Sequence, residues 1–190
     1  MKTLRFSLTV LLFAFASLAS PVMAKEEIYK TADQFLAEAF DGDVPKTKVL
    51  WLKSDVKALT KEILDHAYPA LRIRYWMRDD QSAWILEEIG KERPITMGMV
   101  VKGNQIRYSE ILAYRESRGW EVRYPQFMVQ YAGATLTEDK KLDRLIDGIT
   151  GATLSVQAVT RIARLALALH QHVMPDEVVA KSATRSADNG

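Results

Sequence analysis

The spacing of the apolar residues changes twice along this chain, and that change most restricts its fold. Helical spacing near the start gives way to alternation of apolar and polar residues, and helical spacing returns over 154–173. "LRIRYWMR" (71–78) alternates, turns at Asp79-Asp80 and is followed by "AWILEEI" (83–89), which predicts a β-hairpin. "PITMGMVVK" and "QIRYSEILAY" predict two more strands, joined at Gly103-Asn104. The pattern predicts an α+β fold, a mostly antiparallel central sheet flanked by helices with a long helix at its C-terminal end.

Local signals set the other expected elements. Thr31 and Gln34 have the spacing of a capping box at a helix start, and Ser54 is predicted to cap a second helix. "KVLWL" (48–52) predicts a short strand between these helices. "WEVRYPQFMVQY" (120–131) predicts a strand that bends at its proline, and "KLDRLID" (141–147) predicts one or two helical turns.

Residues 1–24 have the organisation of a secretory signal peptide. Lys2 and Arg5 precede an apolar run, and small residues then lead to a cleavage position after Ala24. We therefore expect a periplasmic protein, with an uncleaved anchor disfavoured because the run is short for a membrane span. The remainder is expected to be one domain, with an N-terminal region over 25–92, its main part over 93–175 and a disordered tail over 176–190.

Charge and cysteine content exclude several classes of function. Removing Lys2 and Arg5 with the signal peptide changes 26 Lys+Arg against 24 Asp+Glu into 24 against 24. A near-neutral chain argues against a nucleic-acid partner. The absence of cysteine excludes disulfides, thiolate metal sites, iron–sulfur clusters and Cys-attached haem.

"DGITGATLSVQAV" (147–159) stands directly before the long helical pattern and has two interpretations. In the first, a Thr or Ser oxygen caps the helix by accepting from its unpaired N–H groups. In the second, those N–H groups and the helix dipole favour a phosphate. Gly151 and Ala152 would then leave room for the phosphate, and a threonine hydroxyl there could be esterified to it.

The residues from Asp147 to Thr153 resemble the Asp-x-x-(Ser/Thr)-Gly-Ala-(Thr/Ser) flavinylation motif of FMN-binding domains. That family includes the C subunit of sodium-pumping NADH:quinone oxidoreductase and the G subunit of the Rnf complex, besides small single-domain periplasmic members. The resemblance implies FMN linked through a phosphoester to Thr153. It also implies a partner, a separate exported flavin transferase that uses FAD and Mg²⁺.

A second stretch, "YRESRGWEVR" (114–123), is similar to a His-x-Glu-Thr-Pro-Gly-like segment of many family members. Glu116, Ser117 and Gly119 match that segment, whereas Tyr114 and Arg118 depart from its His and Pro. The departures bear on contacts to the flavin ring and leave the attachment residue unaffected. The predicted cofactor-binding residues are Thr153, Asp147, Gly148, Thr150, Gly151, Ala152, Ser155, Glu116, Ser117, Gly119 and Trp120.

Several of these residues have two possible roles. Asp147 is expected to brace the turn or to be read by the transferase, and Thr150 and Ser155 to bond the phosphate or to cap the helix. Arg115 and Arg118 are candidates for tuning the flavin, or are ordinary surface charges. Trp120 is the favoured aromatic for stacking on the ring. The other aromatic candidates, which could equally be core residues, are Trp76, Trp84 and Tyr114.

With one redox cofactor and no NAD fingerprint or haem motif, the chain is predicted to relay electrons and not to complete a reaction alone. Expected partners are cytochromes or a membrane reductase of a respiratory chain. The alternatives are a non-catalytic periplasmic module that binds a phosphate-bearing ligand, and a stand-alone flavin reductase.

Overall fold

A computed structural model of the protein describes residues 27–174. The predicted signal peptide and the predicted C-terminal tail lie outside the described residues. The elements are β1 (Glu27–Ile28), α1 (Ala32–Ala39), β2 (Lys48–Trp51), α2 (Ser54–Leu64), β3 (Arg72–Arg78), β4 (Gln81–Ile89), β5 (Pro94–Lys102), β6 (Gln105–Tyr114), the 3-10 helices η1 (Trp120–Arg123) and η2 (Val129–Tyr131), α3 (Pro125–Met128) and α4 (Thr153–Val173).

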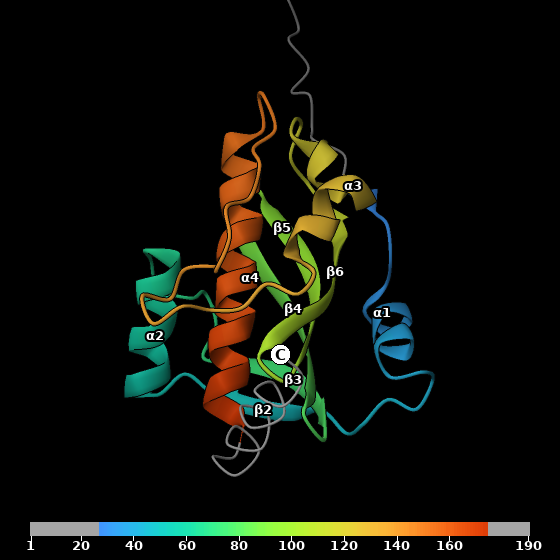
Figure 1. The fold of residues 1–190 in the computed structure, drawn as a ribbon, viewed down its shortest axis with the longest axis vertical. Helices are drawn as coiled ribbons and strands as arrows, with labels where there is room; N and C mark the ends of the chain where they lie inside the picture. Colours follow the sequence, from blue (N-terminus) through green and yellow to red (C-terminus); the bar gives the residue numbers. More distant parts are fainter. Residues whose placement is uncertain (1–26, 175–190) are drawn as a thin grey trace, which may run out of the picture.

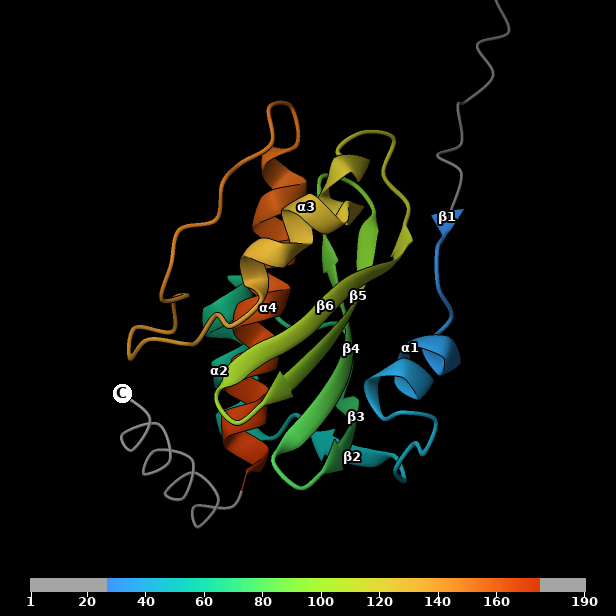
Figure 2. The ribbon, with the colours of Figure 1, turned by 45° about the vertical axis from the view of Figure 1, so that its right-hand side comes forward.

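The strands form one antiparallel sheet in the order β1-β6-β5-β4-β3-β2. β3 to β6 follow one another as hairpins, as the alternating pattern predicts. α4 packs on β4 and β5 with α2 beside it, and α1 lies on the opposite face of the sheet (Figures 1 and 2). The predicted α+β fold, with its antiparallel sheet and long C-terminal helix, is confirmed.

Each face of the sheet has its own core. The larger core lies beneath α4 and includes Trp84, Leu86 and Met97. The smaller one lies beneath α1, where the Phe35 ring packs so close to the β5 backbone that only Gly98 fits. A Cβ at residue 98 would be 2.6 Å from that ring.

Two predicted helix caps have different outcomes. Thr31 and Gln34 form the predicted capping box on α1. Ser54 does not cap α2, because the helix already includes it and the N-cap is Lys53, whose side chain makes no capping bond. The helix is nevertheless present, since its apolar face packs against α4 and supplies most of its stability.

Two other expectations were wrong. Residues 120–131 form η1, α3 and η2 instead of a bent strand. Gly119, with a φ of 83°, ends the extended backbone, and Pro125 starts α3, where its missing N–H is not needed. Residues 141–147 form no helix and belong to the long connection from η2 to α4. That connection crosses α4 to reach α2, where Lys140 contacts Glu62 (Figure 1).

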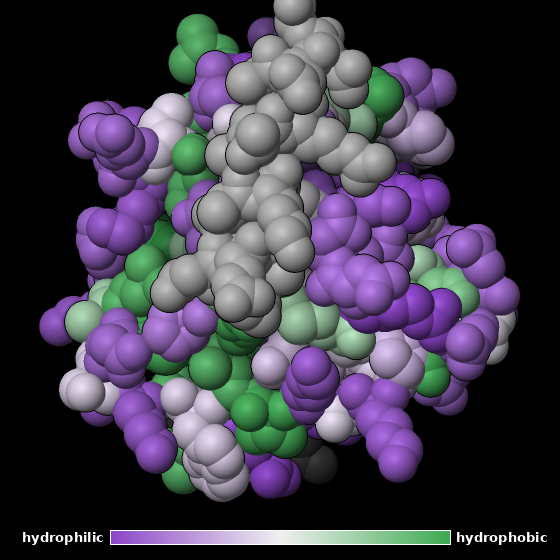
Figure 3. Space-filling model, turned by 60° about the horizontal axis from the view of Figure 1, so that its bottom comes forward, coloured by the Kyte–Doolittle hydropathy of each residue, from purple (hydrophilic) through white to green (hydrophobic). Residues whose placement is uncertain are grey.

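β2 and the last turn of α4 lie at the end of the molecule opposite the start of α4 (Figure 1). In Figure 3, which brings this end forward, apolar side chains gather left of centre and at the lower middle of the face, and polar side chains are densest on the right. β2 contributes the exposed side chains of Val49 and Trp51. Within residues 27–174, no helix is both long and apolar enough to cross a bilayer.

His170 is fully buried near the end of α4. Its Nδ1 lies 2.6 Å from Ser82 Oγ, which accepts a hydrogen bond from the Trp84 indole. Burial lowers the pKa of His170 from its usual 6.5 to about 4, against the opposing influence of the Asp80 carboxylate. The ring is therefore neutral at pH 7.

We expect the stability of the fold to decrease as the pH falls from about 6.5 to about 4. In that range the unfolded chain binds a proton at His170 and the folded chain does not, so acid favours unfolding. The loss attributable to this residue is on the order of 3 kcal/mol. Urea unfolding across the range measures it, with the His170 ring protons followed by NMR. Titration of His170 near pH 6.5 in the folded protein would contradict this expectation.

Candidate functional site

The segment that precedes α4 leaves the helix start uncapped. The N-cap is Ala152, whose side chain carries no hydrogen-bonding group. The N–H groups of Thr153, Leu154 and Ser155 have no acceptor among residues 27–174. Gly151 adopts a φ of 83°, and its Cβ position faces open space. The helix start therefore combines unpaired donors with room for a group that accepts from them.

Neither hydroxyl predicted as a possible cap serves that role. Ser155 is buried, and its Oγ lies 2.8 Å from the hydroxyl of Tyr114 at the end of β6. Thr150 is exposed and makes no hydrogen bond to any other part of the described chain. The alternative that Thr150 or Ser155 caps α4 is therefore wrong.

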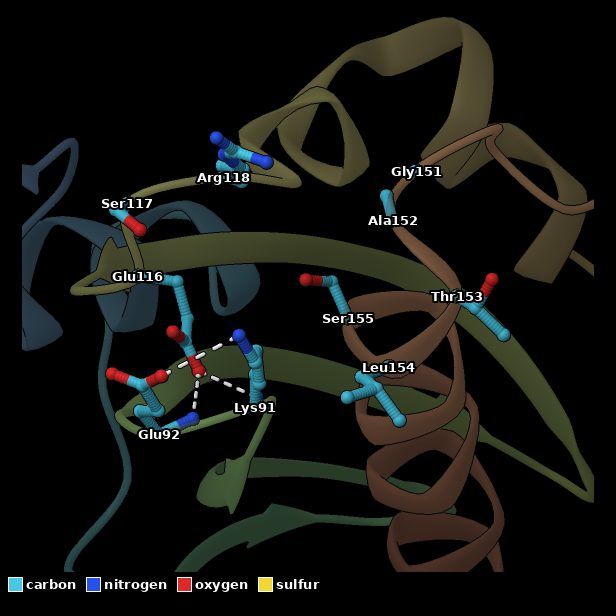
Figure 4. Close-up of a pocket in the computed structure, with 10 residues that line it drawn as sticks. All are labelled: Lys91, Glu92, Glu116, Ser117, Arg118, Gly151, Ala152, Thr153, Leu154 and Ser155. Carbon is cyan, nitrogen blue, oxygen red and sulfur yellow. Dashed lines mark hydrogen bonds and ion pairs between the residues drawn. The ribbon is translucent and has the colours of Figure 1, made fainter.

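A cleft of about 550 Å³ opens beside this helix start, within the range of ~300–1,000 Å³ usual for small-molecule sites. Three segments line it: the β4–β5 turn, the loop after β6 and the start of α4. In Figure 4, Lys91, Glu92 and Glu116 face Leu154 and Ser155 across the cleft. The lining residues are Lys91, Glu92, Glu116, Ser117, Arg118, Gly151, Ala152, Thr153, Leu154 and Ser155.

Glu116 fastens the first two of these segments together. Its Oε1 accepts hydrogen bonds from three successive backbone N–H groups, those of Lys91 at 2.5 Å, Glu92 at 2.6 Å and Arg93 at 2.9 Å. A Cβ at Gly90 would lie 3.0 Å from the same oxygen, so the glycine allows this approach. The Glu116 carboxylate thus ties the wall opposite α4 to the loop after β6.

Tyr114 and Gly119 fasten the loop after β6 to α4. The Tyr114 hydroxyl donates to the carbonyl of Arg118 and contacts Ser155 Oγ. A Cβ at Gly119 would be 2.5 Å from Ser155 Oγ and 2.9 Å from the Tyr114 hydroxyl. Burial raises the pKa of Tyr114 to about 12, so the phenol keeps its proton. Tyr114, which stands where the family segment has His, braces the site from within the core.

The acceptor candidate Thr153 is the first residue of α4 and is exposed. In Figure 4 its side chain lies on the other side of the first helical turn from Ser155. Its hydroxyl makes no hydrogen bond within residues 27–174. The oxygen is therefore accessible to a reagent from solvent.

Asp147 and Gly148 lie away from the lining of the cleft. The Asp147 backbone N–H donates to Gln130 Oε1 at 2.7 Å, which ties this part of the loop to η2. Gly148 has open space around its Cβ position and no positive φ, so neither conformation nor packing requires a glycine there.

Of the two arginine candidates, Arg118 lies in the cleft and Arg115 lies outside it. Arg118 lines the cleft and is exposed, and its side chain has no carboxylate partner in the described part of the chain. Arg115 instead donates to Thr96 Oγ1 at 2.8 Å and lies 3.7 Å from Glu87, outside the lining. Lys91 is a second cation of the cleft, and the sequence analysis missed it.

Most of the aromatic candidates are core residues. Trp84 is fully buried and stacks on Tyr75, and Trp76 lies beneath α1. Trp120 is 38% exposed but does not line the cleft. It contacts Tyr124 edge-to-face and lies under the Arg123 guanidinium.

Sequence reasoning also missed Glu92 and Leu154. Leu154 could have been found from its place beside Thr153. Lys91 and Glu92 lie in a polar turn without periodicity. The hydrogen bonds from this turn to Glu116, which tie it to the site, form only in the folded chain.

The FMN-binding domain family model matches residues 90–168, which include β5, β6, every lining residue of the cleft and most of α4. No curated protein matches the chain. The chain therefore contains an FMN-binding domain over residues 90–168, the family that its motif resembles.

Proposed function

We propose that this protein carries FMN covalently, as a phosphoester of Thr153, and relays electrons in the periplasm. The observation that carries the proposal is an exposed threonine hydroxyl at an uncapped helix start, beside a cleft large enough for a small cofactor. The unpaired N–H groups at that start suit a phosphate. Arg118 and Lys91 supply positive charge in the same cleft.

In the proposed attachment, the Thr153 oxygen attacks the phosphorus on the FMN side of FAD. A new P–O bond forms, the pyrophosphate P–O bond breaks, AMP leaves with its electron pair, and the hydroxyl proton passes to solvent. An exported transferase with bound Mg²⁺ supplies the FAD. Exposure of Thr153 and the open space at Gly151 allow that enzyme to approach.

Bound flavin supplies the redox chemistry, and the chain binds, orients and tunes it. The α4 start would hold the phosphate, and the wall formed by Lys91 and Glu116 would border the rest of the group. Covalent attachment suits an exported carrier, since lost FMN is not readily replaced outside the cytoplasm. Electron donors and acceptors are proposed to be cytochromes or a membrane reductase.

Intact mass under denaturing conditions tests this function directly. Wild-type protein produced with the transferase is expected to gain the mass of one FMN minus water. A module that only binds a phosphate-bearing ligand would lose that ligand on denaturation and show the mass of the bare chain. A stand-alone flavin reductase would turn over a small acceptor without partner proteins, which steady-state assays of the purified protein detect.

A further inference from the structure

The two walls of the cleft come from segments about sixty residues apart in the chain, and they are held in different ways. The α4 side belongs to a 21-residue helix packed on the sheet. The opposite side is the short turn from Gly90 to Arg93, closed by one backbone bond from Gly90 N–H to the Arg93 carbonyl at 3.1 Å. The other hydrogen bonds that hold this turn's backbone within residues 27–174 all end on Glu116.

Glu116 also brings a negative charge into the cleft. Its Oε1 accepts all three N–H groups, and its Oε2 has no hydrogen-bond partner in the described part of the chain. No cation among residues 27–174 forms an ion pair with Glu116, and Lys91, which lies on the turn that Glu116 holds, contacts Glu92 at 3.5 Å. The Glu116 charge is therefore held by backbone N–H dipoles and is paired with no counter-ion among the described residues.

We propose that Glu116 is a positioning residue of the flavin site, which locks the β4–β5 turn as the cleft wall and lowers the reduction potential of the bound flavin. This inference rests on the proposed function. Adding electrons to a group beside a fixed negative charge is less favourable than adding them beside a neutral side chain, so the carboxylate shifts the potential downward. The position of the turn affects the flavin site because it fixes the distance of the Glu116 carboxylate and of Lys91 from α4.

Two substitutions separate the locking from the charge. Glu116→Gln keeps an oxygen that can accept the N–H groups but removes the charge, so the turn stays protected and the flavin potential rises. Glu116→Ala removes both, so the backbone amides of residues 91–93 exchange with deuterium at least about tenfold faster and the potential also rises. Hydrogen exchange is measured on protein produced without the transferase, and the potential on the flavinylated full-length protein.

Acetate provides a rescue test for the anion position. In Glu116→Ala the three N–H groups of residues 91–93 lose their acceptor. The carboxylate of added acetate can accept from them in place of the Glu116 side chain. Added acetate is expected to slow amide exchange in this variant and to lower its flavin potential again, with no effect on wild type. Chloride at the same ionic strength controls for screening.

Glu92→Gln is the matched control, because Glu92 lines the same cleft but its side chain is 71% exposed and bonds no backbone group within residues 27–174. It is expected to leave amide exchange unchanged and to change the flavin potential less than Glu116→Gln does.

Two results would overturn the inference. One is unchanged amide exchange in Glu116→Ala, and the other is a flavin potential in Glu116→Gln no higher than in Glu92→Gln. Wild-type protein without covalent FMN would instead overturn the proposed function, and the exchange result on the turn would still stand.

Discussion

Thr153→Ala protein, produced together with the flavin transferase, is expected to be colourless and to have the mass of the bare chain. The substitution removes the only oxygen through which the proposed phosphoester forms. Folding should be unaffected, because the Thr153 side chain is exposed and makes no hydrogen bond within residues 27–174. Alanine is also a better helix former than threonine, so stability should change by less than about 0.5 kcal/mol.

Thr153→Ser is the matched control, since it restores a hydroxyl at the same first position of α4. It should regain covalent FMN, seen as in-gel flavin fluorescence after denaturing electrophoresis and as the FMN mass increment. Thermal unfolding of all three proteins checks that the fold is kept. Covalent FMN on folded Thr153→Ala protein, mapped for example to Thr150, would show that the acceptor is assigned wrongly.

Gly119→Ala is expected to destabilise the fold by about 2–5 kcal/mol. The residue has a φ of 83°, which costs a side-chain-bearing residue ~1–2 kcal/mol. The new methyl would also stand 2.5 Å from Ser155 Oγ and 2.9 Å from the Tyr114 hydroxyl, and overpacking of this kind costs about 1–3 kcal/mol more. Those two groups hold each other by a hydrogen bond, so neither can move away cheaply.

Gly42→Ala isolates the backbone part of that effect. Gly42 has a φ of 84°, nearly that of Gly119, but nothing lies within 4 Å of its Cβ position. We expect it to cost about 1–2 kcal/mol, and urea denaturation of both variants gives the difference. Equal losses in the two variants would mean that contact with Ser155 and Tyr114 contributes nothing, and that the loop is not braced as described.

The regular elements could be predicted because their signals are periodic and repeated. The hairpin from 71 to 89 shows alternation on both sides of a two-residue turn, and α4 begins within one residue of its predicted start. Thr153 was predicted from a short motif, and the match over residues 90–168 confirms the family from which that prediction came.

Features set by contacts between distant residues could not be read from local patterns. Serine is a residue type favoured at helix N-caps, yet the Ser155 hydroxyl forms a hydrogen bond with Tyr114, 41 residues away. Residues 120–131 alternate like a strand, but the left-handed Gly119 and the α3 start at Pro125 redirect the backbone. Glu116 was expected to contact the cofactor. Its role in holding the β4–β5 turn depends on three backbone N–H groups, which every sequence has and which no residue pattern can therefore indicate.

The order in which the chain folds follows from the hairpin connections. β3 to β6 are joined by turns of two to four residues, so their pairings close small loops at low entropic cost. α4 reaches β4 and β5 only by closing a loop of at least fifty residues. We therefore expect the four-stranded meander to form early and α4 to dock late. During that interval the β4–β5 turn is already formed but the acceptor loop is not yet seated beside it, so a modifying enzyme and the docking helix would compete for the same segment.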